Sequence, residues 1–178
     1  MNRRRFLART ATLTAAAVFA PRALRAACAP VVPAGVQLYT VRDQLEGDPR
    51  GTLAKLHAIG IVEGELYGLN GPENASLFGL AIEDLKRAFD ANGIKVPMSH
   101  VGGELTNTAA IAGIAHTLGI GTLVVALPSE FTAQRDGRFA MVPAESRAQL
   151  DRLAEKLNRA GREYKAQGLA FGYHNHWV

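Results

Sequence analysis

Residues 106–128, TNTAAIAGIAHTLGIGTLVVALP, contain the two elements whose repetition decides the fold. The first part, 106–119, follows a Thr or Asn cap and ends on Gly119, as helices often do. The second part, GTLVVALP (121–128), is a continuous apolar run, typical of a strand that is buried on both faces. The stretch therefore predicts a helix followed by a buried strand of a parallel sheet.

The same pattern recurs along the chain. Strands are predicted at 35–41, 62–68, 94–102, 121–128 and 169–178, and helices at 52–60, 82–93, 106–119 and 146–168. A helix is the usual crossover between consecutive parallel strands, so this alternation predicts an α/β fold with five parallel strands and four helices.

Two ways of closing such a sheet have to be distinguished. The chain has no Gly-x-Gly-x-x-Gly after its first strand and no GxxxxGK[ST], so the phosphate-binding loops of open nucleotide-binding sheets are absent from the sequence. Polar residues instead stand toward the carboxyl ends of the predicted strands, where β/α barrels place their chemistry. These residues are Gln37, Tyr39, Glu65, Tyr67, His100, His174 and His176. The pattern favours a partial (β/α)8 TIM barrel over an open sheet.

Residues 1–29 have the composition of an export signal. A basic start containing RRRFL (3–7) is followed by a short apolar run and then by small residues around Cys28. The run is shorter than the roughly 20 apolar residues that span a bilayer, so no permanent membrane helix is expected. RRxFL resembles the twin-arginine signal of bacterial secretion, with Asn2 where that signal usually has Ser or Thr. The segment predicts a periplasmic or secreted protein, and Cys28 indicates a cleavage junction or, alternatively, a lipid anchor.

The charge of the chain is concentrated in that segment. The formal net charge is +4, and residues 1–29 contain six arginines and no acidic residue, so the rest of the chain has a charge of −2. A protein that binds nucleic acid needs several basic residues on one face to neutralise phosphates. We therefore expect no nucleic-acid partner.

The domain predicted at 30–178 also carries a family resemblance, which covers residues 35–176. The ordered series VQLYTVRD, TLAKLHAIG with VEGELYG, MSHVG and GLAFGYHNH resembles the sugar phosphate isomerase and epimerase family with a xylose-isomerase-like barrel. The resemblance implies a (β/α)8 barrel that binds a divalent metal ion and moves protons next to a sugar carbonyl. It also implies a sugar or sugar derivative as the small-molecule partner.

The chain departs from that family after its last motif. The HNH strand of the family usually continues into an acidic stretch and three further strands, whereas here only Trp177 and Val178 follow. We therefore expect the later metal ligands to lie beyond residue 178 and the barrel to be incomplete. A divalent metal is expected for the full-length family but not as a stable ligand of this chain. The alternative function is a non-catalytic truncated remnant or a half-barrel that binds a ligand or a partner, and such a chain would self-associate through its open sheet edges.

Candidate site residues follow from the strand ends. We expect Glu65, His174 and His176 to be catalytic, with the two histidines leaving the same face of the last strand. Imidazoles so placed can hold a divalent metal or a sugar hydroxyl, or can simply pack. Glu65 suits general base work, or is a solvated rim charge, and Glu63 on the same strand face is a second candidate for that role. Substrate-binding candidates are Gln37, Tyr39, His100 and Asn175.

Two helical histidines and one long connection can be explained with or without a function. His57 and His116 lie in predicted helices and are expected to be structural. Residues 129–145 form an unusually long connection between a strand and a helix, which predicts either a mobile lid over the site or an insertion without a role.

Overall fold

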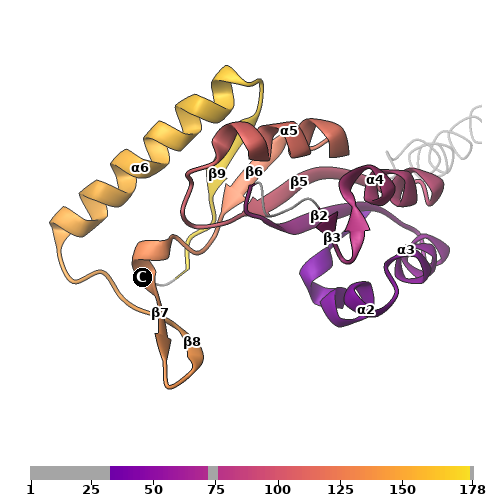
Figure 1. Cartoon of the computed structure of the whole chain (residues 1–178), viewed down its shortest axis with the longest axis horizontal. Coiled ribbons are helices and arrows are strands. Elements are labelled where there is room, and N and C mark those ends of the chain that lie inside the picture. Colours follow the sequence, from indigo (N-terminus) through magenta and orange to yellow (C-terminus); the bar gives the residue numbers. More distant parts are fainter. Residues whose placement is uncertain (1–32, 72–75, 177–178) are drawn as a thin grey trace, which may run out of the picture. The chain divides into compact units, whose positions relative to one another are not determined.

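The computed structural model describes residues 33–71 and 76–176. The predicted export signal at 1–29 lies outside the described residues. The described part contains one sheet of five parallel strands, β1 (Ala34–Gln37), β2 (Ile61–Leu69), β5 (Lys95–Val101), β6 (Thr122–Val125) and β9 (Ala170–Tyr173) (Figure 1). Their spatial order is β1-β2-β5-β6-β9, the same as their order in the chain. The predicted α/β fold with five parallel strands is confirmed.

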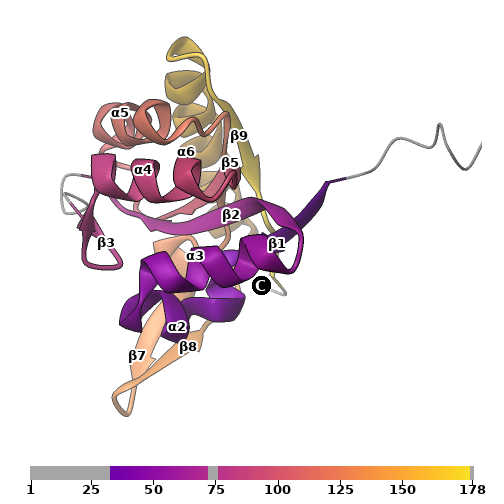
Figure 2. The same ribbon diagram turned by 90° about the vertical axis from the view of Figure 1, so that its right-hand side faces the viewer.

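The strand order also decides between the two ways of closing a sheet. In a doubly wound sheet the strand order reverses at a switch point, and helices cover both faces. Here each crossover moves one strand further in the same direction. Because such crossovers are right-handed, the helices fall on the same face of the sheet. Helices α3 (Pro49–Ala58), α4 (Ile82–Ala91), α5 (Thr108–Leu118) and α6 (Arg147–Ala166) contact one another in chain order (Figure 2). This is the arrangement of a partial barrel.

Three predicted segments differ from the observed ones. The first strand ends at Gln37 rather than at residue 41, and the 3-10 helix η1 (Leu38–Val41) and helix α2 (Arg42–Gly47) follow it. The side chain of Gln37 accepts a hydrogen bond from the backbone N–H of Tyr39, which stabilises this early turn. The first crossover therefore contains two α-helices, α2 and α3, where one was predicted. The last strand ends at Tyr173 rather than extending to residue 178.

The long connection 129–145 contains regular structure. It forms the 3-10 helix η2 (Ser129–Phe131) and an antiparallel hairpin of β7 (Thr132–Arg135) and β8 (Arg138–Met141). A smaller hairpin, β3 (Ser76–Leu77) with β4 (Leu80–Ala81), precedes α4. Both hairpins interrupt crossovers at the carboxyl ends of the parallel strands.

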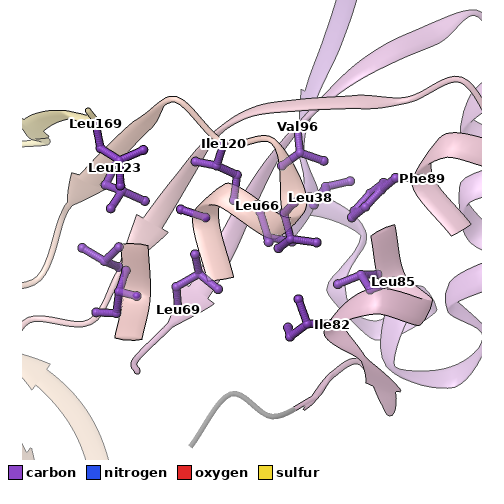
Figure 3. Close-up of a cluster of buried hydrophobic side chains, with 14 of the residues drawn as sticks. Leu38, Leu66, Leu69, Ile82, Leu85, Phe89, Val96, Ile120, Leu123 and Leu169 are labelled. Carbon is purple, nitrogen blue, oxygen red and sulfur yellow. The ribbon is translucent and has the colours of Figure 1, made fainter. Parts of the chain in front are cut away.

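The hydrophobic core lies between the sheet and the helices. Figure 3 shows this cluster, in which Leu66 and Leu69 of β2, Leu123 of β6, and Leu85 and Phe89 of α4 take part. Each of these five side chains is at most 1% exposed, so each contributes roughly 1.5–3 kcal/mol of burial free energy. The core therefore covers one face of the sheet, and the opposite face is left to form a site.

The residues at several helix ends are of types that commonly cap helices. Asp48 Oδ1 accepts a hydrogen bond of 2.9 Å from the N–H of Gly51 at the start of α3, and Ser146 caps α6 in the same way. Gly119 ends α5 with a φ of 80°, which only glycine adopts without strain. Within the described ranges, no helix combines the length and apolar character needed to span a bilayer.

Candidate functional site

A change of register in β5 points His100 away from the helices. Glu63 of β2 pairs with Lys95 and Glu65 pairs with Met98, so β5 contains one extra residue between these two pairs. Before this bulge, Val96 is buried in the core; after it, the buried residues are Ser99 and Val101. A strand with strict alternation would turn His100 toward the helices together with Val96. The bulge therefore re-aims His100 to the free face of the sheet.

That face contains a pocket of about 840 Å³ at the carboxyl ends of the parallel strands. Seven of the residues singled out in the sequence line it: Gln37, Tyr39, Glu65, Tyr67, His100, His174 and His176. Asn175 does not line it and is exposed, so the structure does not bring this substrate-binding candidate to the pocket. Several apolar wall residues were not predicted, namely Met98, Val101, Val124, Ala126 and Leu127.

Four side chains form a continuous row along the pocket. Glu65 Oε1 lies 2.9 Å from Nδ1 of His100, and Nε2 of His100 lies 3.1 Å from Nδ1 of His174. The ring of His174 stacks on that of His176 with 4.8 Å between centroids and 13° between planes. The row joins β2, β5 and the segment after β9, so three separate parts of the chain build it.

His100 is the central member of this row. Its side chain is 18% exposed and that of Glu65 is 24% exposed. Burial lowers the pKa of His100, and the neighbouring His174 adds to this effect while Glu65 opposes it. Nδ1 has no well-aligned hydrogen-bond partner in the described part of the chain despite the short approach of Glu65. Hydrogen bonds in free active sites are often poorly aligned and become shorter and straighter in complexes.

The two terminal histidines follow β9 and do not lie on it, which corrects their predicted position. The backbone N–H of His174 donates a 2.9 Å hydrogen bond to the carbonyl of Val125, which fixes the segment against β6. His174 is exposed and His176 is half-buried. The predicted sharing of one face holds, since the two rings stack against each other.

Aromatic side chains form the wall of the pocket near β1 and β2. Tyr39 and Tyr67 meet edge to face with 5.1 Å between centroids, and Phe78 lies 5.5 Å beyond Tyr67. Arg42 stands 4.6 Å above the ring of Tyr39. Burial raises the pKa of Tyr67, with a further contribution from Glu46. Tyr39 is 54% exposed and lines the pocket, so part of its side chain is accessible to a ligand.

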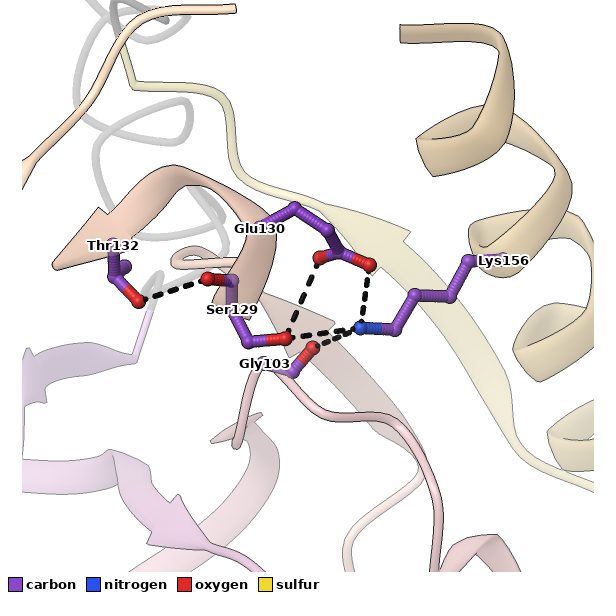
Figure 4. Close-up of polar contacts among 5 residues, drawn as sticks. All are labelled: Gly103, Ser129, Glu130, Thr132 and Lys156. Carbon is purple, nitrogen blue, oxygen red and sulfur yellow. Dashed lines mark hydrogen bonds and ion pairs between the residues drawn. The ribbon is translucent and has the colours of Figure 1, made fainter. Parts of the chain in front are cut away.

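Lys156 of α6 holds the loops beside the pocket together. Its Nζ donates to the carbonyl of Gly103 at 2.9 Å and to Ser129 Oγ at 3.2 Å, and pairs with Glu130 Oε1 at 2.8 Å (Figure 4). Burial alone would raise the pKa of Glu130, but the hydrogen bond and charge of Lys156, together with a backbone hydrogen bond and one from Ser129, outweigh it and the pKa is lowered. The sequence shows Lys156 only as one charge on an amphipathic helix, so nothing there indicates this role.

The other candidates lie elsewhere. Glu63, two residues before Glu65, does not line the pocket. His57 and His116 are exposed on α3 and α5, as expected for residues without a part in the site.

The fit of a metal ion can be judged from the donor groups. Among residues 33–71 and 76–176, no three or more His, Cys, Asp or Glu side chains are grouped so that they would hold an ion. Zinc sites use at least three protein ligands. The described residues therefore do not form a metal centre by themselves.

The fold and the pocket define an α/β protein built as part of a TIM barrel, with its site at the carboxyl ends of the strands. Comparison with solved structures supports the fold. The chain is similar to a sugar phosphate isomerase/epimerase from Parabacteroides distasonis, with 23% identity and a TM-score of 0.62 over 83% of this chain and 53% of that one. A xylose isomerase-like TIM barrel protein from Mycobacterium smegmatis, solved in complex with magnesium, has 13% identity and a TM-score of 0.55 over 79% and 53%.

A second solved sugar phosphate isomerase/epimerase from Parabacteroides distasonis matches at 22% identity and a TM-score of 0.62, over 80% of this chain and 54% of that one. The chain thus spans about half the length of these solved structures. No protein-family model and no curated protein matches it.

Proposed function

We propose that this chain contributes residues to a site that transfers a proton next to a carbonyl or hydroxyl carbon of a sugar or sugar derivative, as an isomerase or epimerase does. The observation that carries the proposal is the row from Glu65 through His100 to His174, which opens into the pocket. Parallel β/α folds bind their ligands at this end of the strands. The likeness of fold to solved isomerases and epimerases supports the same reaction class.

The pocket has the two kinds of surface that a sugar requires. A sugar ring has hydroxyl groups at its edge and C–H groups on its faces. Gln37 and the histidines offer polar groups to the hydroxyls, while the accessible part of Tyr39 and the side chain of Met98 offer apolar surface. A histidine with a pKa near neutrality can take up and return a proton at physiological pH.

A divalent metal ion remains an expectation from the family resemblance. A metal in the complete site would polarise the carbonyl oxygen of the substrate. Because the described residues do not form its site alone, further ligands would have to come from elsewhere. Elemental analysis of the purified protein for magnesium, manganese and zinc tests this expectation.

The experiment for the function uses solvent deuterium. The protein is incubated in D2O with aldoses, ketoses, their phosphates and the corresponding sugar acids, with and without added Mg²⁺ or Mn²⁺. Deuterium at the carbon beside the carbonyl is followed by proton NMR. We expect enzyme-dependent exchange with at least one substrate class. Binding of a sugar without exchange would favour the ligand-binding alternative, and neither binding nor exchange across the panel would overturn the proposal.

Location and association are proposed on other grounds. The sequence pattern of residues 1–29 supports export to the periplasm. β1 and β9 are the outer strands of the sheet in the described part of the chain, and unpaired strand edges favour self-association. Sedimentation of the purified protein, with and without Tyr173→Lys on β9, measures whether that edge takes part.

A further inference from the structure

We infer that Glu65 is a positioning residue, which fixes the protons of His100 and His174 so that Nε2 of His174 is left free to receive the proton of the substrate. This inference rests on the proposed function and assigns the roles within its site. It changes the expectation from the sequence, in which Glu65 was itself a catalytic candidate.

The first step concerns the proton between Glu65 and His100. Oε1 of the carboxylate and Nδ1 of the imidazole are 2.9 Å apart. If Nδ1 carried a lone pair, it would face a negatively charged oxygen at this distance and repel it. A proton on Nδ1 converts the repulsion into attraction, and carboxylates commonly fix histidine tautomers in this way. His100 therefore carries its proton on Nδ1.

The second step concerns the contact between the two imidazoles. His100 lies among partly buried groups and its ring is largely shielded from water, which favours the neutral form. A neutral ring with its proton on Nδ1 has a lone pair on Nε2. Nδ1 of His174 is 3.1 Å from that lone pair, so His174 must donate to it.

The third step follows for the far side of His174. A neutral His174 with its proton on Nδ1 has an unprotonated Nε2. His174 is exposed and lines the pocket, where a ligand can reach it. The substrate's O–H or C–H bond breaks, its electron pair stays on the substrate, and the proton forms a new bond to Nε2. The resulting imidazolium donates through His100 toward the carboxylate of Glu65, which stabilises the charge.

His176 completes the arrangement without entering the proton chain. Its ring stacks nearly parallel on His174, with 13° between the planes. Stacking fixes the plane of the His174 ring and hence the direction of its Nε2 lone pair. We assign His176 a positioning role as well.

The experiment reads the protons directly, without substrate. Long-range ¹H–¹⁵N spectra of the protein labelled at histidine distinguish a ring protonated on Nδ1 from one protonated on Nε2. Single variants His100→Gln and His174→Gln assign the signals. We expect both rings to carry the proton on Nδ1 near pH 7.5, although free histidine prefers Nε2. Once the signals are assigned, a wild-type His174 protonated on Nε2 would overturn the inference.

A substitution then tests whether Glu65 sets the pattern. In Glu65→Ala, His100 loses the partner of its Nδ1 proton, and we expect His174 to shift toward the Nε2-protonated form although Glu65 does not touch it. Glu63→Ala makes the same chemical change two residues away on β2 and should leave both tautomers unchanged. An unchanged His174 in folded Glu65→Ala would contradict the positioning role. The spectra need no turnover, so their outcome is independent of the deuterium-exchange experiment.

Discussion

Nδ1 of His174 lies 3.1 Å from Nε2 of His100, although 74 positions separate the two residues in the chain. The sheet explains how they meet. His100 of β5 pairs with Val124 of β6, and Val124 pairs with Gly172 of β9, two residues before His174. The contact therefore depends on parallel register across three strands, and any change that shifts the register separates the two rings.

Stability should fall as the pH is lowered through the titration of His100. Burial lowers its pKa in the folded protein from the ordinary value of 6.5. Above 6.5 the ring is neutral in both states and the folded state has its full stability. As the pH falls below 6.5, the unfolded chain takes up the proton first, so stability is lost until the pH passes the folded pKa.

Urea denaturation of wild type and His100→Gln at pH 7.5, 6.5 and 5.5 measures this effect. We expect the wild type to lose more stability over this range than His100→Gln does. His116→Gln, at an exposed position of α5, is the matched control and should follow the wild type. Equal slopes for wild type and His100→Gln would show that His100 does not titrate as described.

Lys156 should prove important for the order of the loops beside the pocket. Its side chain is 13% exposed. Its Nζ donates hydrogen bonds to Gly103 and Ser129 and forms an ion pair with Glu130. Lys156→Met keeps the aliphatic stem but leaves these acceptors without their donor, which should cost about 1–3 kcal/mol. Faster amide hydrogen exchange in Thr132–Met141 should accompany the loss.

The control for Lys156 lies on the same helix. Lys165→Met removes a charge from the last turn of α6 at an exposed position and should change stability by about 0.5 kcal/mol or less. If Lys156→Met and Lys165→Met lost the same amount of stability, the contacts of Lys156 would not stabilise the protein as described.

Gly64 should be intolerant of a side chain. A Cβ at this position would lie 3.2 Å from Cδ1 and 3.3 Å from Cγ of Leu38, so this fully buried side chain would have to shift. Gly64→Ala should therefore cost about 1–3 kcal/mol by overpacking and should disturb the neighbouring Glu65. Gly113→Ala on α5 meets nothing within 4 Å and should raise stability by about 0.5–1 kcal/mol. Thermal denaturation of both variants provides the comparison.

The sequence predicts the order of strands and helices because hydrophobic periodicity repeats with each β/α unit. The helix predicted at 106–119 is observed near its predicted bounds, and the strand within GTLVVALP is observed as Thr122–Val125, three residues shorter at its end than predicted. The first strand was predicted too long because Gln37 turns the chain through a contact of its own side chain. The hairpin of β7 and β8 was not predicted because its residues resemble those of a polar loop.

The sequence predicts only those site residues that lie near the ends of parallel strands. Residues near strand ends, such as Glu65 and His100, can be recognised because parallel strands bring their carboxyl ends together. The bulge in β5 that aims His100, and the anchor formed by Lys156, depend on contacts between distant elements. No local pattern in the sequence reports such contacts. Asn175, a substrate-binding candidate from the sequence, does not line the pocket.

The rate of solvent deuterium incorporation into the preferred sugar, measured for wild type and His174→Gln, tests the central claim most directly. His57→Gln on the surface of α3 serves as control. If His174 accepts the proton of the substrate, its replacement should slow exchange by roughly 10²- to 10⁴-fold while His57→Gln retains the wild-type rate. Exchange at the wild-type rate in folded His174→Gln would contradict the account.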